Sequence, residues 1–125
     1  MAHLLIIDDD LGFRALLNDY FSDLGYQVTL SEGGSDGLSL AKKLKPDVIL
    51  LDAMMPNISG IEVLRSMQAD EDLRFIPALI ITGSHFETTV RDLFMSEINC
   101  KGFFSKAIPL NTIAEELKKI LKGKI

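Results

Sequence analysis

The sequence predicts an α/β fold of three layers, in which five parallel strands lie between two layers of helices. Short apolar runs of strand length alternate along the chain with segments whose apolar residues recur at helical spacing. Three of these runs show almost no alternation with polar residues, as expected of parallel strands that helices bury on both faces. With right-handed crossovers, this order of elements gives a doubly wound (βα)5 sheet.

The individual elements follow from the same two spacings. We expect strands near residues 4–7, 26–30, 48–51, 77–81 and 102–104. The intervening helices are indicated by apolar stripes, which consist of Phe13, Leu16, Leu17, Tyr20, Phe21 and Leu24; Leu38, Ala41 and Leu44; Ile61, Leu64 and Met67; Phe86, Val90, Leu93 and Phe94; and Ile113, Leu117, Ile120 and Leu121.

Capping residues and prolines stand where these helices should begin and end. Asp10 suits the cap of the first helix, and Gly25 suits a left-handed position at its end. Asn99 could take the same left-handed conformation after the fourth helix. Pro46 stops the second helix, and Pro109 stands near the start of the last one, where its missing N–H costs little. The loops are short, so residues 1–125 are expected to form a single domain.

Composition excludes several classes of protein. The net charge of −5 argues against direct nucleic-acid binding, which depends on basic contacts to phosphates. No apolar run approaches the ~18 residues of a transmembrane span, so membrane insertion is not expected, and the N-terminus does not resemble a signal peptide. The single cysteine, Cys100, forms no internal disulfide and fits the reducing cytoplasm. His3 and His85 are isolated, with no partner that would make either a catalytic base.

Polar residues follow four of the apolar runs. Asp8 and Asp9 follow the first run, Asp52 the third and Thr82 the fourth, and Lys106 comes two residues after the fifth. Ligands of open parallel sheets bind beyond the carboxyl ends of the strands, so these side chains should share one pocket.

The residue types in that pocket suit a divalent cation and a phosphoryl group. Carboxylates held close together repel one another unless a proton or a cation relieves the repulsion. Mg²⁺ typically binds one or two carboxylates together with phosphate oxygens and water, and Asp8 and Asp9 are the expected pair. Asp52 could then act as a nucleophile that forms an aspartyl-phosphate. Lys106 would supply positive charge to a phosphoryl oxygen, and the Thr82 hydroxyl would donate to another.

These motifs resemble the response-regulator receiver domain of two-component signalling. The resemblance rests on residues 4–10, 47–60, 77–83 and 102–106, and therefore covers essentially the whole chain. The stretch from Asp52 to Gly60 is specific, because Pro56 and Gly60 stand in their family places. The resemblance implies a flavodoxin-like sheet with strand order 2-1-3-4-5.

The resemblance also assigns roles to the site residues. It makes Asp52 the phosphoacceptor, phosphorylated by a histidine kinase or a phosphotransfer protein. It implies that Asp8 and Asp9 hold Mg²⁺ together with Asp52 and the main-chain carbonyl of Met54. Thr82 and Lys106 would contact the phosphoryl group. Such a chain is not an enzyme acting on other substrates, since it assists only its own phosphorylation and dephosphorylation.

The output of the switch is implied in the same way. Phe103 occupies the place of the family's switch aromatic residue, which turns inward when the threonine moves toward the phosphate. The surface of the fourth and fifth helices would then change for a downstream protein target or an output domain. Met54 and Ser84 flank the site, and we expect them to tune the dephosphorylation rate by controlling the access of water. The side chains of Met54 and Met55 are expected to pack rather than to take part in redox chemistry.

Two positions depart from the family pattern. Ala107 stands where the family usually has a proline after a cis peptide bond. A non-proline cis bond costs about 2.5–4 kcal/mol, yet we expect a cis bond because Lys106 needs a defined path to the phosphate. Gly83 replaces a small alanine after Thr82, which predicts a looser loop with faster hydrogen exchange.

Other functions compete with this prediction. A phosphorylation-independent interaction module of the same fold would dock a partner through its fourth and fifth helices, but degenerate receivers usually lack one of the acidic residues. Asp8 and Asp10 also resemble the nucleophile loop of haloacid-dehalogenase-type phosphatases, although Gly12 stands where those enzymes need threonine or valine. A flavin carrier of the same topology would need a Ser/Thr-rich phosphate loop after the first strand, and none is present.

Overall fold

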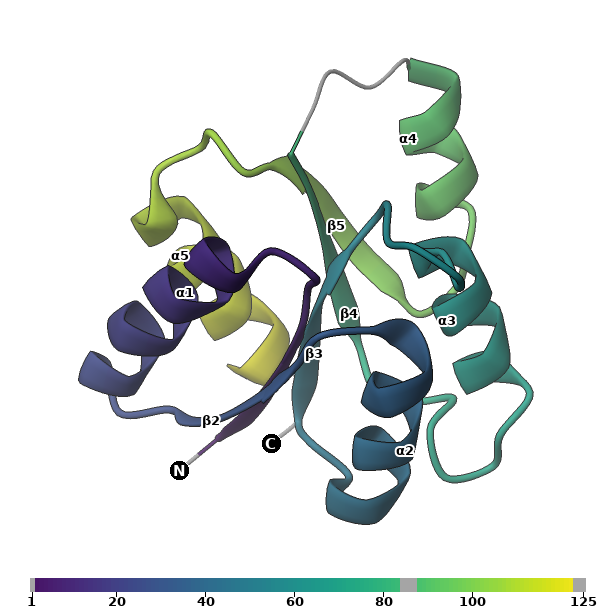
Figure 1. The fold of residues 1–125 in the computed structure, drawn as a ribbon, viewed down its shortest axis with the longest axis horizontal. Helices are drawn as coiled ribbons and strands as arrows, with labels where there is room; N and C mark the ends of the chain where they lie inside the picture. Colours follow the sequence, from purple (N-terminus) through teal and green to yellow (C-terminus); the bar gives the residue numbers. More distant parts are fainter. Residues whose placement is uncertain (1, 84–87, 123–125) are drawn as a thin grey trace.

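One parallel sheet organises the molecule. The computed structural model describes residues 2–83 and 88–122. Its sheet has the strand order β2-β1-β3-β4-β5, with every pair parallel, which confirms the predicted topology (Figure 1). The strands are β1 (His3–Ile7), β2 (Gln27–Ser31), β3 (Val48–Asp52), β4 (Ala78–Thr82) and β5 (Cys100–Ser105).

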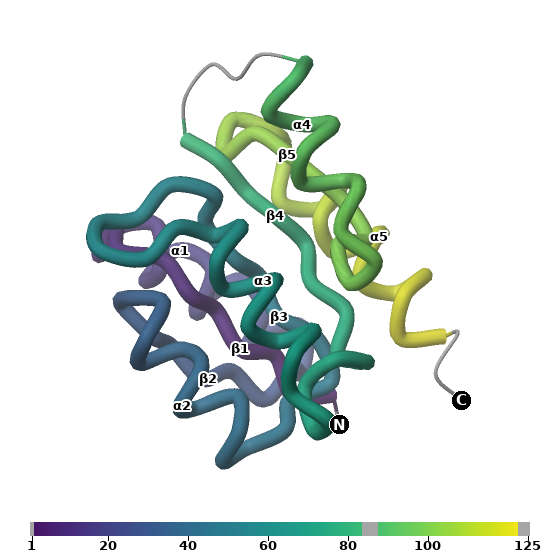
Figure 2. Tube along the Cα trace, turned by 90° about the vertical axis from the view of Figure 1, so that its right-hand side faces the viewer, coloured from purple at the N-terminus to yellow at the C-terminus, as the bar shows by residue number. Residues whose placement is uncertain are grey.

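The helices form a layer on each face of the sheet. Figures 1 and 2 place α1 and α5 on one face and α2, α3 and α4 on the other. The helices are α1 (Leu11–Asp23), α2 (Gly34–Leu44), α3 (Gly60–Gln68), α4 (Thr88–Met95) and α5 (Leu110–Lys122). Two core clusters result, because alternate side chains of the central strands point to opposite faces of the sheet. One cluster lies under α2, α3 and α4, and the other lies under α1 and α5.

Burial explains the continuous apolar strands. Every residue of β3 and β4 is buried, since both strands have a neighbouring strand on each side and a helical layer on each face. The edge strand β2 is different, because Gln27 and Leu30 are exposed. Its partly polar sequence therefore reflects its position at the edge of the sheet.

The predicted helix ends are mostly confirmed. The Asp10 side chain caps α1 by accepting the Phe13 N–H at 3.1 Å, and Gly25 follows that helix with φ at +96°. The prediction for Asn99 is wrong, because among the described residues other than glycine only Lys45 and Asn57 have positive φ. The Asn99 side chain is instead buried and ties the start of β5 to α3.

The contacts of Asn99 explain this correction. Its amide donates to the Leu64 carbonyl at 3.1 Å and accepts from Gln68 Nε2 at 2.9 Å. A buried amide is stabilised by such partners, so the side chain lies in a packed polar junction rather than at a helix cap.

The apolar stripes are narrower than the sequence pattern predicts. Leu17 and Phe21 of α1 are buried, but Leu16 and Leu24 are about half exposed, at 51% and 52%. Leu93 of α4 is similarly exposed, and Phe86 of the predicted stripe lies outside the described residues. A helix lying on a flat sheet buries only the side chains that point directly at the sheet, and the flanks of the stripe stay in solvent.

Candidate functional site

Three carboxylates converge at the carboxyl edge of the sheet. Asp8 directly follows β1, Asp52 is the last residue of β3, and these two strands are neighbours. One carboxylate oxygen from each of Asp8, Asp9 and Asp52 lies within 4.8 Å of the others. Asp8 and Asp52 are buried, whereas Asp9 is exposed. The structure thus brings together the acidic residues that the sequence singled out.

The loop after β1 is held by several hydrogen bonds. Asp8 Oδ1 accepts the Asp10 N–H at 2.8 Å, and the Asp8 N–H donates to the Ser31 carbonyl at 3.0 Å. The Asp8 main-chain carbonyl accepts from Arg14 Nη1 at 2.7 Å. Sequence reasoning missed Arg14, because a basic residue in the first turns of a helix normally indicates only a solvated side chain. Its guanidinium fixes the backbone of the loop that carries the acidic pair.

The loop after β3 is held by close backbone contacts. Asp52 Oδ1 accepts the Met54 N–H at 3.3 Å, and the Gly60 N–H donates to the Ala53 carbonyl at 3.0 Å. A Cβ atom on Gly60 would lie 2.6 Å from the Asp52 carbonyl oxygen, which is closer than real Cβ contacts allow. Gly60 therefore lets the start of α3 approach the main chain of the Asp52 loop.

Lys106 reaches the acidic cluster from the end of β5. Its Nζ atom lies 2.9 Å from Asp8 Oδ2 and 3.8 Å from Asp52 Oδ2. Its N–H donates to the Thr82 carbonyl at 2.8 Å, which ties the ends of β4 and β5 together. The predicted convergence of Lys106 with the carboxylates is confirmed.

The expectation of a cis bond between Lys106 and Ala107 is wrong. This bond is trans, as are all peptide bonds in the described part of the chain. Without proline the trans form is strongly preferred, and Lys106 reaches Asp8 without the cis geometry. The Ala107 N–H also donates to the Ser105 hydroxyl at 3.0 Å, a bond that proline could not make.

The electrostatics of the site follow from this crowding. Burial, together with the nearby charge of Asp8, raises the pKa of Asp52 to about 7, despite the opposing effect of Lys106. Burial alone would lower the pKa of Lys106, but its hydrogen bond to Asp8 and the charges of Asp52, Asp8 and Asp10 together raise it. Lys106 is therefore cationic, while Asp52 ionises at a higher pH than an ordinary aspartate.

An open cavity of about 290 Å³ lies over these groups. It is lined by Asp9, Asp10, Asp52, Met54, Thr82, Gly83 and Lys106. Thr82 is the buried last residue of β4. It lines this cavity together with Asp9, Asp10 and Asp52, so it lies beside the carboxylates as predicted. The predicted faster hydrogen exchange of the Gly83 loop stays a prediction, and Ser84 and His85 lie outside the described residues.

The donor set fits a hard divalent cation. Three carboxylates face one ammonium group, so the cluster carries an excess of negative charge that a cation with oxygen ligands would neutralise. Met54 lines the same cavity, but the residue is 67% exposed, so the prediction that its side chain packs is wrong. The Met54 carbonyl remains a predicted ligand that rests on the family resemblance alone.

Phe103 lies away from this cavity, in the core. It is buried under α4, where its ring lies 5.4 Å from that of Phe94, measured between centroids. Phe104 packs on the opposite face of the sheet, against the cluster under α1 and α5. The structure therefore connects β5 to α4 through Phe103, and its role as a moving switch stays a prediction.

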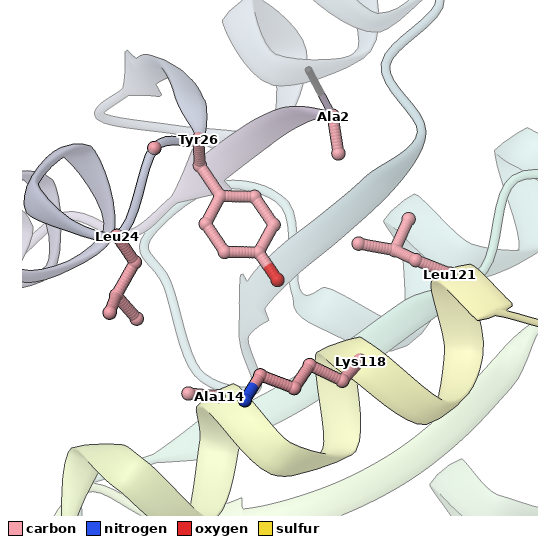
Figure 3. Close-up of a pocket in the computed structure, with 7 residues that line it drawn as sticks. Ala2, Leu24, Tyr26, Ala114, Lys118 and Leu121 are labelled. Atoms are coloured by element: carbon pink, nitrogen blue, oxygen red, sulfur yellow. The ribbon is translucent and has the colours of Figure 1, made fainter.

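A second cavity, of about 420 Å³, has a different chemistry (Figure 3). It lies between the α1–β2 turn and α5 and is lined by Leu24, Tyr26 and Leu121, with the Lys118 side chain extended along α5. No carboxylate is among the described residues that line it, so it does not offer the oxygen ligands that a divalent metal prefers. No helix in the described ranges is long and apolar enough to cross a membrane.

Comparisons with known proteins agree with this geometry. A family model described as the response regulator receiver domain matches residues 4–118. The chain is 30% identical to protein PilH of Pseudomonas aeruginosa, with 98% of this chain and 100% of the relative covered. It is 34% identical to sporulation initiation phosphotransferase F of Bacillus subtilis, with 94% of this chain and 92% of the relative covered.

Solved structures give the same fold. The chemotaxis protein CheY4 of Vibrio cholerae superimposes with a TM-score of 0.87 at 26% identity, covering 97% of this chain and 99% of that one. A receiver domain protein from Clostridium thermocellum reaches a TM-score of 0.90 at 21% identity, covering 99% and 97%, which supports the fold alone. From the family match and the converging acidic site, this chain belongs to the response regulator receiver domains of two-component signalling.

Proposed function

We propose that the chain is a Mg²⁺-dependent phosphoacceptor switch, in which Asp52 receives the phosphoryl group. One observation carries this proposal: the buried Asp52 carboxylate meets two further carboxylates and an ammonium group at the base of an open cavity. Such a constellation is suited to phosphoryl transfer, which depends mainly on positioning and on neutralising charge.

The transfer would proceed by in-line displacement at phosphorus. A carboxylate oxygen of Asp52 forms a bond to phosphorus as the bond from phosphorus to the donor nitrogen of a phosphohistidine breaks, and the electron pair leaves with the imidazole. Mg²⁺, held by Asp8, Asp9 and Asp52, would supply positive charge for the phosphoryl oxygens.

The remaining groups would hold the product. The Lys106 ammonium needs only a short movement from its position 3.8 Å from Asp52 Oδ2 to reach a phosphoryl oxygen on that residue. The Thr82 hydroxyl, at the end of β4, would donate to another phosphoryl oxygen. Charge and hydrogen bonds would thus stabilise a phosphoryl group that is bound covalently to Asp52.

The donor in this proposal is a histidine kinase or a phosphotransfer protein. A relative whose name describes a sporulation phosphotransferase supports a place in such a relay. The receiver would change the surface formed by α4 and α5 for a downstream protein or an output domain, since Phe103 packs on Phe94 of α4. The chain would act on itself and not as an enzyme on other substrates.

Intact mass spectrometry tests the proposal directly. The wild-type protein incubated with acetyl phosphate and Mg²⁺ is expected to gain one phosphoryl group. Asp52→Asn should gain none, because its amide is not a nucleophile, and excess chelator should suppress the reaction of the wild type.

An Asp→Asn substitution far from the site controls for the loss of one carboxylate. Asp23→Asn makes the same chemical change at an exposed position at the end of α1 and should be phosphorylated like the wild type. An unreactive wild-type protein would contradict the proposal and favour the phosphorylation-independent interaction module. An adduct that persists in Asp52→Asn would also contradict the proposal, because another residue would then accept the phosphoryl group.

A further inference from the structure

An aromatic ring covers one side of the Lys106 ammonium. Lys106 Nζ lies 4.7 Å from the centroid of the Phe13 ring, within the range of a cation–π interaction. Its other side faces the acidic cluster, with Asp8 Oδ2 at 2.9 Å and Asp52 Oδ2 at 3.8 Å. The ammonium is therefore held between a ring and two carboxylates, and its side chain is only 17% exposed.

The Phe13 ring is itself well anchored. Phe13 lies in the first turn of α1, and its N–H donates to the capping Asp10 side chain at 3.1 Å. Its side chain packs against the core cluster under α1 and α5. The helix cap fixes the Phe13 main chain and the core cluster packs against its side chain, so the ring keeps its position relative to the loop that carries Asp8 and Asp9.

Two other neighbours of the Lys106 side chain, Ala107 and Gly83, constrain its position less than Phe13 does. The next residue, Ala107, is exposed and follows a trans bond, and its turn rests on a hydrogen bond to the Ser105 hydroxyl. Gly83 contributes no side chain, although a Cβ atom there would lie 3.4 Å from Lys106 Cδ. The Phe13 ring therefore gives the ammonium a contact that neither the exposed Ala107 nor Gly83, which has no side chain, supplies.

We propose that Phe13 is a positioning residue, whose ring holds the Lys106 ammonium beside Asp52 and so prepares it for the phosphoryl oxygens. This inference rests on the proposed phosphoacceptor function. The ring contributes the negative potential of its face, which attracts the cation, and a surface that keeps the lysine from turning toward solvent.

Fluorinated phenylalanines test this role, because fluorine weakens the potential of the ring face with little change in shape. Phenylalanine and its mono-, di- and trifluorinated forms are placed at position 13 by site-specific incorporation, and phosphorylation by acetyl phosphate with Mg²⁺ is timed. The logarithm of the rate is expected to fall in proportion to the number of fluorines, by about fivefold in total. The midpoint of urea unfolding should stay nearly constant across the series.

Two substitutions with ordinary amino acids at position 13 and a control at another phenylalanine complete the series. Phe13→Leu should be slow and Phe13→Tyr should restore most of the rate, since tyrosine keeps the ring face. Phe104 packs in the same core cluster, and no cation lies over its ring among the described residues. Trifluorination of Phe104 should leave the rate unchanged.

A rate that is independent of fluorination at position 13, or one that rises with it, would overturn the inference. A second readout does not depend on phosphorylation: the ring current of Phe13 should shift the Lys106 ε-methylene protons upfield in the NMR spectrum, and Phe13→Leu should abolish the shift. Absence of the shift in the wild type would also overturn the inference. A wild-type protein that shows the shift but accepts no phosphoryl group would instead refute the proposed function.

Discussion

At the residue scale, the chemistry of the site depends on how strongly the fold opposes the charge on Asp52. This carboxylate is buried beside Asp8, and its pKa is raised to about 7. The fold therefore raises the cost of ionising Asp52 as long as no further positive charge is present. A divalent cation would reverse this preference, because it neutralises the repulsion that keeps the pKa high.

This raised pKa predicts a pH-dependent stability difference between the wild type and Asp52→Asn. An acid whose pKa is higher in the folded state loses stability as pH rises from the unfolded pKa to the folded one, here from 3.8 to about 7. The asparagine variant escapes this loss, since it does not ionise. Without divalent metal it should be the more stable protein at pH 8, by on the order of 3–4 kcal/mol, and the difference should shrink toward pH 4.

Urea unfolding in chelator at several pH values measures that difference. Added Mg²⁺ should narrow it at pH 8 by stabilising the wild type more than the variant, because only the wild type offers the Asp52 carboxylate. A difference that does not vary between pH 4 and pH 8 would show that Asp52 ionises without cost to the fold.

At the scale of elements, the β3–α3 loop depends on a glycine that permits close backbone contact. A side chain at Gly60 would collide with the Asp52 carbonyl oxygen and the Ala53 backbone, at 2.6 and 3.1 Å. Backbone atoms cannot move aside as a flexible side chain can, so Gly60→Ala should lower the free energy of unfolding by about 2–3 kcal/mol. The displaced loop should also slow phosphorylation of Asp52.

A second glycine provides the comparison for this loop. Gly33 has an extended backbone with φ at −164°, and a Cβ atom there would meet nothing within 4 Å. Gly33→Ala should therefore change the free energy of unfolding by no more than about 1 kcal/mol. Urea unfolding of both variants measures the two effects, and equal losses would mean that the close contact at Gly60 is not the cause.

At the scale of the whole molecule, the site touches the ends of β1, β3, β4 and β5, but α4 is the helix linked to it through a buried aromatic pair. Thr82 and Lys106 join the ends of β4 and β5, and Phe103 of β5 packs on Phe94 of α4. The edge strand β2 pairs only with β1, and its last residue, Ser31, accepts a main-chain hydrogen bond from Asp8. The site is thus linked to α4 through packed side chains and to β2 through main-chain hydrogen bonds, and we expect a change in side-chain packing to be felt mainly at α4.

Hydrogen exchange with and without beryllofluoride and Mg²⁺ should reveal this asymmetry. Amides of residues 88–105 are expected to change their exchange rates when the mimic binds at Asp52, whereas amides of β2 (Gln27–Ser31) should change little. Uniform slowing across the molecule, or a change confined to the loop after β1, would contradict a signal that travels through β5 and α4.

Much of this architecture could be predicted from the sequence, because it depends on local patterns. Apolar runs and helical stripes predicted the order of the elements. The positions of Asp8, Asp52 and Lys106 at or just after strand ends predicted that their side chains would meet. These predictions succeed because every parallel strand ends at the same edge of the sheet, whatever the details of its packing. Phe13, by contrast, was predicted only as a core residue of a helical stripe, and its contact with Lys106 was not foreseen.

Several side-chain contacts and exposures were decided only by the tertiary structure. Arg14 binds the Asp8 carbonyl, Asn99 bonds to Leu64 instead of capping a helix, and Leu16 stays half exposed. Each outcome depends on the exact approach of side chains from separate elements, which periodicity does not encode. The sequence by itself therefore determined the fold, the family resemblance and the acidic site, because these follow from spacing along the chain. The tertiary structure alone decided how Lys106 is held, since its peptide bond to Ala107 is trans and its ammonium lies over the ring of Phe13, a residue far away in the sequence.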